Sequence, residues 1–187
     1  MSANVTQTVH PELAAMGADR IEEEHRAYRA RYALALARIS LGWVFLWAFL
    51  DKTFGLGFAT TTENAWVNGG SPTYGFLNFG TEGKVFHDFF AGLAGPVADW
   101  TFMLGLLGIG AALILGIGMR AAAASGVLLM TAMWAASLRL DNNPFMDDHL
   151  VYAIVLVALA MFGAGRTWGL GRAWEKLPLV QRHRYLI

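Results

Sequence analysis

The sequence predicts an all-α membrane protein, folded as an antiparallel bundle of four transmembrane helices. Of its 187 residues, 56% are hydrophobic and only 15% are charged, whereas about 25% is usual in soluble domains. The apolar residues form four long runs, and a helix needs about 20 such residues to cross a hydrocarbon core of about 30 Å. Basic residues gather at alternate ends of these runs, as the positive-inside rule expects.

The four runs divide the chain into one membrane domain between two polar ends. Residues 1–31 are predicted to be a cytoplasmic segment with a flexible start and a short surface helix, because they lack the order of a signal peptide. The basic tail, residues 166–187, is predicted on the same side. The membrane domain, 32–165, places its spans at about 32–54, 96–118, 121–138 and 148–162.

An outer loop, residues 55–95, connects the first two spans. Its Gly69-Gly70-Ser71-Pro72 tract is typical of a turn. Residues 82–93 repeat apolar side chains at helical spacing, which predicts a helix lying in the membrane interface. Gly108, Ala112 and Gly116 recur every four residues in the second span, a pattern that lets another helix approach closely.

The charge bias orients the bundle. The N-terminal flank, the turn at Arg120 and the basic tail carry most of the arginines, so these segments and both termini are predicted to be cytoplasmic. The loops at 55–95 and 139–148 are predicted to lie outside the cell.

Composition and residue placement exclude several function classes. The net charge is zero and basic residues do not cluster with aromatic ones, which argues against nucleic-acid binding. Without cysteine, the chain has no disulfide and no thiolate chemistry of its own. No haem is expected, because none of the five histidines falls in the middle of a predicted span.

Three stretches carry a resemblance to a known family. The run from Arg38 to Lys52 (RISLGWVFLWAFLDK) resembles the first helix of the DoxX/DoxD-like membrane proteins. The blocks Trp66–Pro72 and Asp141–His149 are similar to later parts of that family. The resemblance implies a four-helix protein of a bacterial or archaeal cell membrane. Its DoxD branch implies a subunit of a thiosulfate:quinone oxidoreductase that works beside a second redox subunit.

The outer ends of the predicted helices hold the candidate site. A quinone needs hydrogen-bond donors at its carbonyls and an apolar, aromatic slot for its ring. Arg139, His149 and Asp148 are the candidate catalytic residues, with Asp148 orienting or reprotonating the imidazole. The candidate residues for binding quinone (ubiquinone or menaquinone) are Lys52, Asp51, Trp47, Trp43, Trp134 and Asn142.

A structural interpretation of the same residues stays open. Asp147 and Asp148 suit the N-terminus of the last helix as caps, and Trp47 and Trp134 suit an aromatic belt. No metal site is predicted, since the Asp147–His149 spacing fits an ordinary helix start. Arg38, the one charge well inside a span, is expected to reach the cytoplasmic surface and to serve structure or orientation.

Two functional hypotheses follow. The first is a quinone-interacting membrane subunit of an oxidoreductase. The second is a non-catalytic membrane anchor or accessory subunit of a respiratory complex. No flavin or nicotinamide motif appears in the sequence, so both hypotheses require another redox subunit as partner, with membrane lipid around the helices. The sequence leaves open whether the chain is an enzyme by itself.

Overall fold

A computed structural model describes residues 11–141 and 143–186, and all of its regular structure is helical. Three helices are long and apolar enough to cross a membrane: α1 (Pro11–Phe54), of which residues 19–54 qualify, α3 (Pro96–Leu115) and α4 (Met119–Ala136). Large apolar side chains on them face outward; Val97 and Leu128, for example, are 82% and 74% exposed. Such outward apolar surface is what a lipid environment requires, and the chain is a membrane protein by this criterion.

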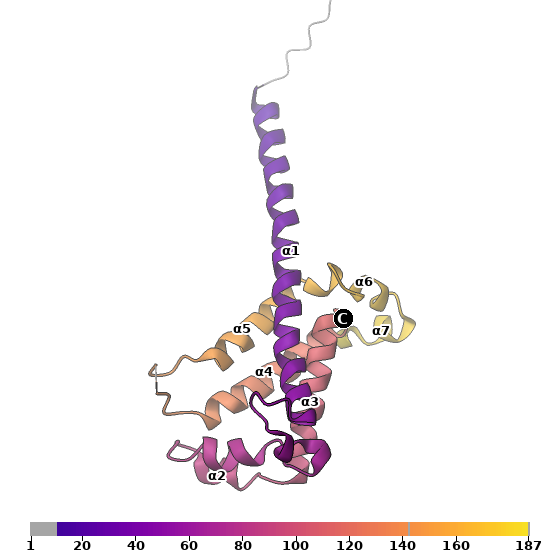
Figure 1. Cartoon of the computed structure of the whole chain (residues 1–187). Coiled ribbons are helices and arrows are strands. Elements are labelled where there is room, and N and C mark those ends of the chain that lie inside the picture. The colour runs from indigo at the N-terminus through magenta and orange to yellow at the C-terminus, as the bar shows by residue number, and fades with distance from the viewer. Residues whose placement is uncertain (1–10, 142, 187) are drawn as a thin grey trace, which may run out of the picture.

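A fourth apolar helix, α5 (Asp148–Met161), has 14 residues. It is about 21 Å long at 1.5 Å per residue, which is shorter than a hydrocarbon core of about 30 Å. The predicted fourth span therefore stays a prediction. Helix α3 packs against α1 and α4, and α4 packs against α5 (Figure 1).

Helix α1 differs most from the sequence prediction. Instead of a separate surface helix followed by a span, one 44-residue helix runs from Pro11 to Phe54. Its N-terminal half stands clear of the other helices in Figure 1, and residues 19–31 are all exposed. The predicted flexible start, residues 1–10, lies outside the described residues. No proline or glycine falls between residues 18 and 41, so nothing in the sequence breaks the helix before it enters the bundle.

The connection between α1 and α3 is compact but only partly helical. It contains short 3-10 turns at Thr62–Asn64 and Trp66–Asn68, a π-helical turn at Phe76–Gly80, and α2 (His87–Ala91). Helix α2 covers only five of the twelve residues predicted to form an interfacial helix, and its position in an interface stays a prediction. After α5 come a 3-10 turn at Ala164–Arg166, α6 (Gly171–Trp174), α7 (Pro178–Arg182) and a last turn at Arg184–Leu186.

The close approach of α1 and α3 depends on two glycines that the sequence pattern did not single out. A Cβ atom on Gly110 would lie 2.8 Å from the backbone nitrogen of Leu46, and one on Gly42 would lie 2.9 Å from the side chain of Ile114. By contrast, a Cβ on Gly108 would meet nothing within 4 Å. Within the predicted stripe, Gly108 therefore makes no close contact with another helix, whereas Gly116 lies against Arg38 of α1.

Arg38 is fully buried, and the expectation that it reaches the cytoplasmic surface is wrong. Its guanidinium donates to the carbonyl oxygens of Leu113 and Ile114 in the last turn of α3, the latter at 3.1 Å. It also donates to the oxygens of Thr167 (3.2 Å) and Trp168 (2.8 Å), beyond α5. The last carbonyls of a helix have no intrahelical partner and carry partial negative charge, so they suit a buried cation.

Four glycines make room for this contact, which we call the Arg38 junction: Arg38 with Gly116, Gly165, Gly169 and Gly171. A Cβ on Gly116 would lie 2.6 Å from an Arg38 nitrogen, and one on Gly171 would lie 2.6 Å from the Gly165 oxygen. Gly116 also has a φ of +72°, which ends α3 in a left-handed cap. Larger residues would separate the segments that Arg38 ties together.

Replacing Arg38 tests the junction. Arg38→Met keeps a long apolar side chain but leaves four buried or partly buried carbonyl oxygens without their donor. We expect a loss of about 3–5 kcal/mol in the free energy of unfolding, the usual cost of removing one partner from a buried charged network. Arg31→Gln, at an exposed position on the same helix, should change stability by less than about 1 kcal/mol. Unfolding of both variants in detergent micelles measures the difference, and equal stability would contradict the structural role.

Candidate functional site

A covering segment, residues 71–77, lies over the end of the bundle where α1 ends and α3 begins. Asp99, in the first turn of α3 and 8% exposed, holds it in place. One oxygen of its carboxylate accepts hydrogen bonds from the hydroxyls of Ser71 (2.8 Å) and Thr73 (2.6 Å) and from the Thr73 amide (3.0 Å). Three donors satisfy the buried charge, so the covering segment is fixed on α3.

An apolar cavity of about 310 Å³ lies beneath the covering segment. Ring and aliphatic side chains from four parts of the chain form its walls, and Lys52 is its only charged residue. Lys52 forms no hydrogen bond or ion pair with any residue that the structure describes. Its ammonium lies 5.9 Å from the centre of the Phe102 ring. The other lining residues are Pro72, Thr73, Phe76, Leu77, Phe90, Leu93, Ala98, Thr101, Phe102, Leu129, Ala132, Met133 and Ala136.

A second, more polar cavity adjoins the first. It has a volume of about 560 Å³ and shares Lys52, Pro72 and Phe76 with the apolar cavity. Its remaining walls carry hydroxyl and amide groups from Thr60, Thr61, Asn64, Ser71 and Tyr74. Lys52 therefore stands between an apolar compartment inside the bundle and a polar one among the loops.

Asp51, next to Lys52, points elsewhere. It is 2% exposed, and its carboxylate accepts from the amides of Phe58 (3.3 Å) and Ala59 (3.0 Å). Trp47 packs against Phe58 with ring centres 5.1 Å apart, and Trp43 lies 5.8 Å from Trp47. This face of α1 holds the loop at residues 56–60, and none of its three predicted quinone-binding residues lines the apolar cavity.

Arg139 lies on the α4–α5 loop rather than at the apolar cavity. Its φ of +86° is unusual for a residue with a side chain. The guanidinium donates to the Gly83 oxygen at 3.1 Å, while Lys84 donates to the Arg139 oxygen at 3.0 Å. Arg139 also lines a shallow cavity of about 460 Å³ with residues 83–89, among them His87. It thus joins the α4–α5 loop to the segment before α2.

His149 and its neighbours form a helix start. Asp147 caps α5 by accepting from the Leu150 amide at 3.2 Å, which confirms the capping interpretation for that residue. Its other oxygen lies 2.7 Å from His149 Nδ1, and Asp148 lies 3.6 Å from the same nitrogen. One ligand atom from each of these three residues falls within 4.8 Å of the others, as a metal would require. The cap and the Asp147–His149 contact already account for that grouping.

The predicted site residues therefore do not share one cavity. Of the eight that the structure describes, Lys52 alone lines the apolar cavity, and Arg139 lines the separate one by residues 83–89. Trp134 donates its indole N–H to the Phe145 oxygen at 2.8 Å, which fixes the α4–α5 loop. Asn142 lies outside the described residues.

Sequence reasoning missed the walls of the apolar cavity and the role of Asp99. The one available signal was Asp99 itself, a lone acid in the first turn of an otherwise apolar helix, 28 residues after Ser71. Cavity walls such as Phe102 and Met133 look like ordinary membrane-facing residues in the sequence, because nothing in their spacing shows that the covering segment lies across them.

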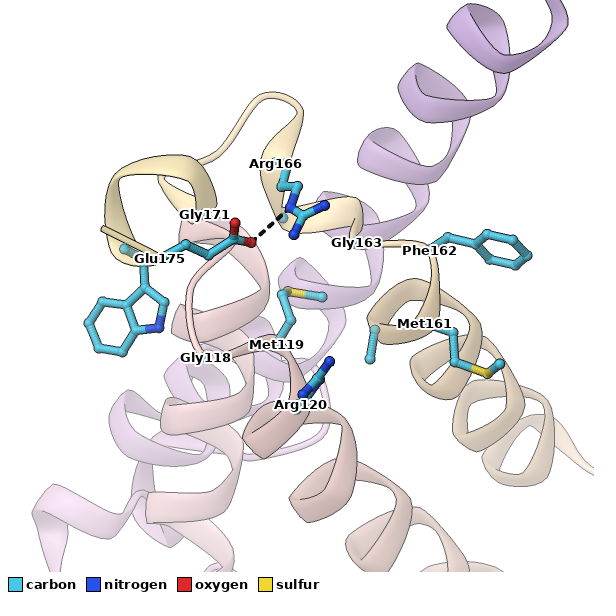
Figure 2. Close-up of a pocket in the computed structure, with 13 residues that line it drawn as sticks. Gly118, Met119, Arg120, Met161, Phe162, Gly163, Arg166, Gly171 and Glu175 are labelled. Atoms are coloured by element: carbon cyan, nitrogen blue, oxygen red, sulfur yellow. Dashed lines mark hydrogen bonds and ion pairs between the residues drawn. The ribbon is translucent and has the colours of Figure 1, made fainter. Parts of the chain in front are cut away.

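A fourth cavity lies at the opposite end of the bundle, next to the Arg38 junction. We call it the arginine cavity; its volume is about 160 Å³. Arg120 of α4 and Arg166 of the turn after α5 both line it, and Figure 2 shows Met119 between their side chains. Arg166 Nε donates to Glu175 at 2.8 Å, and this carboxylate raises the pKa of Arg166.

Comparison of the chain with protein-family models, with curated proteins and with solved structures gives no match. The resemblance to the DoxX/DoxD-like proteins therefore stays a prediction from short motifs.

The hold of Asp99 on the covering segment is open to a direct test. Asp99→Ala removes the acceptor of three hydrogen bonds, so we expect the amides of residues 71–77 to exchange hydrogen for deuterium at least about tenfold faster. Asp141→Ala, which removes an exposed carboxylate from the α4–α5 loop, should leave that exchange unchanged. Peptide-resolved hydrogen exchange of the two proteins in micelles makes the comparison. Unaltered exchange in Asp99→Ala would show that other contacts hold the segment.

Proposed function

We propose that this chain is a quinone-interacting membrane subunit of an oxidoreductase, with the quinone ring bound in the apolar cavity beside Lys52. The observation that carries the proposal is an apolar cavity with one unpaired cation at its edge. Ligand sites are concave and mostly apolar, with a few polar groups that orient the ligand, and they commonly measure about 300–1,000 Å³. A quinone has this character, because two carbonyl acceptors interrupt an otherwise apolar ring and tail.

In this proposal Lys52 donates a hydrogen bond to one quinone carbonyl. An ammonium in an apolar compartment stabilises negative charge more strongly than one in water, so it favours the reduced ring. Phe76, Phe90 and Phe102 supply flat apolar surface for the ring. The neighbouring polar cavity gives water a route to Lys52, and reduction of a quinone takes up protons as well as electrons. The electrons come from a second redox subunit.

The proposed orientation keeps the sequence prediction. Both termini, the Arg120 turn and the arginine cavity are cytoplasmic, and Lys52 with the covering segment lies near the outer surface of a bacterial or archaeal membrane. Helix α5 serves as the fourth span in this arrangement, with its ends extended by the loops around it.

A non-catalytic anchor is the second candidate, and the N-terminal half of α1 favours it. Residues 19–31 form an exposed helix that extends beyond the bundle and carries both acidic and basic side chains. Such a charged helix suits contact with another subunit. The two candidates differ in whether the chain by itself retains a quinone.

Quinone retention separates them. Lys52→Gln should lower the quinone content of gently purified protein about tenfold, because the charged donor is lost from an apolar site. Lys176→Gln, which removes an exposed lysine of the basic tail, is the matched control and should retain the quinone. Lipid-extract mass spectrometry, normalised to folded protein, gives the ratio. Absence of quinone from the unaltered protein would favour the anchor.

The same measurement shows whether the quinone binds in the apolar cavity or beside Arg139 and His149 on the α4–α5 side. Arg139→Gln and His149→Gln leave the walls of the apolar cavity unchanged, so both variants should retain quinone at the normal level. A loss in either variant equal to that in Lys52→Gln would move the proposed site toward the α4–α5 loop.

Topology is tested by labelling single introduced cysteines, since the chain has none of its own. Cysteines placed at Gly83 and Asn143 should react in intact cells with a reagent that does not cross membranes. Cysteines at Gly118 and Lys176 should react only after the cells are opened. The reverse pattern would overturn the orientation.

A further inference from the structure

The arginine cavity has more positive than negative charge. Three charged residues line it, Arg120, Arg166 and Glu175. Glu175 neutralises one arginine at most, so one positive charge is left over. With a volume of about 160 Å³ the cavity is small for a quinone ring and tail, but it suits a compact anionic group.

Much of the hydrogen-bonding capacity of the two arginines is unused. Arg166 uses Nε for Glu175, and its two terminal nitrogens have no partner among the described residues. Arg120 uses Nη1 for the Arg184 oxygen at 3.0 Å, which leaves its other two nitrogens without a described partner. Guanidinium groups bind the oxygens of a phosphate through paired N–H donors. Both arginines line this cavity, with Arg166 above Met119 and Arg120 below it in Figure 2, so an anionic group bound there has a guanidinium on either side of Met119.

The surroundings of the cavity are apolar and face outward. Met161 and Phe162, at the end of α5, line it and are 78% and 73% exposed. Ile154, two turns earlier on α5, is 61% exposed as well. An anionic group bound between the arginines would therefore have an exposed apolar helix face beside it, along which hydrocarbon chains can lie.

We propose that the arginine cavity binds the phosphate group of an anionic phospholipid, whose acyl chains lie along the exposed face of α5. The site is separate from the apolar cavity at Lys52, and the proposal does not depend on quinone binding. Gly116, Gly165 and Gly171 belong both to this cavity and to the Arg38 junction. A bound lipid would thus connect the ends of α4 and α5 with α6 and stabilise the junction.

The experiment measures lipid binding and thermal stability of the full chain in nanodiscs. Phosphatidylglycerol, but not phosphatidylcholine, should be retained by the unaltered protein and raise its Tm. The double variant Arg120→Gln/Arg166→Gln should bind phosphatidylglycerol at least about tenfold more weakly, since charge-assisted hydrogen bonds from both guanidiniums are lost. The control, Lys176→Gln/Arg182→Gln, removes two exposed charges from the same tail and should bind normally.

A third variant keeps the test decisive if the double variant fails to fold. Glu175→Gln removes the competing carboxylate and retains both arginines, so its affinity for phosphatidylglycerol should rise. An unchanged or lower affinity in this variant would overturn the proposal. Equal losses in the arginine variant and the control would show general surface attraction, which also overturns it.

A final arm identifies the source of the phosphate. Inorganic phosphate is added to protein in phosphatidylcholine nanodiscs, where we expect no increase in Tm at millimolar concentration. A rise equal to that caused by phosphatidylglycerol would show that the ligand is free phosphate and not a lipid.

Discussion

The buried guanidinium of Arg38 is the contact on which one end of the bundle depends. A buried charge is costly unless it finds hydrogen-bond partners, and here four backbone oxygens from α3 and from the segment after α5 accept from the two terminal nitrogens of Arg38. The contact joins α1 to parts of the chain 75 to 130 residues away. It requires glycine at the points of closest approach, which explains why Gly116, Gly165, Gly169 and Gly171 gather around a single side chain.

The opposite end uses the same principle with the charge reversed. Asp51 and Asp99 are buried carboxylates, and neither forms an ion pair with a cation in the part of the chain that the structure describes. Asp51 instead accepts hydrogen bonds from two backbone amides of the loop at 56–60. Asp99 accepts from one backbone amide and two hydroxyls of the covering segment. Buried charge therefore organises both ends of this bundle through charge-assisted hydrogen bonds, most of them to backbone groups. The irregular connection of residues 55–95 gains its defined shape from these two anchors.

Lys52 differs from the other charges in the bundle because no described residue is its partner. Its neighbour Asp51 is already engaged with the loop at 56–60, so the ammonium is left at the boundary of the apolar and polar cavities. An unsatisfied donor beside an apolar compartment is the arrangement that an acceptor-bearing, lipid-soluble ligand would complete. The arginine cavity offers the corresponding arrangement for an anionic headgroup at the other end, so two classes of membrane molecule have separate places on one small bundle.

Sequence by itself determined the helical membrane class and the approximate limits of α3, α4 and α5, because runs of apolar residues must span or be buried whatever their neighbours are. It also identified Arg38 as a structural charge and Asp147 as a cap. It did not reveal that α1 begins as early as Pro11. It could not determine the surroundings of either end. Whether Lys52 and Arg139 share a cavity depends on how residues 55–95 fold back over the helices, and that path is set by the contacts of Asp51 and Asp99 with distant backbone groups. Tertiary structure alone decided that Gly42 and Gly110, rather than Gly108, bring α1 and α3 together, because a periodic pattern does not reveal which face a neighbouring helix will occupy.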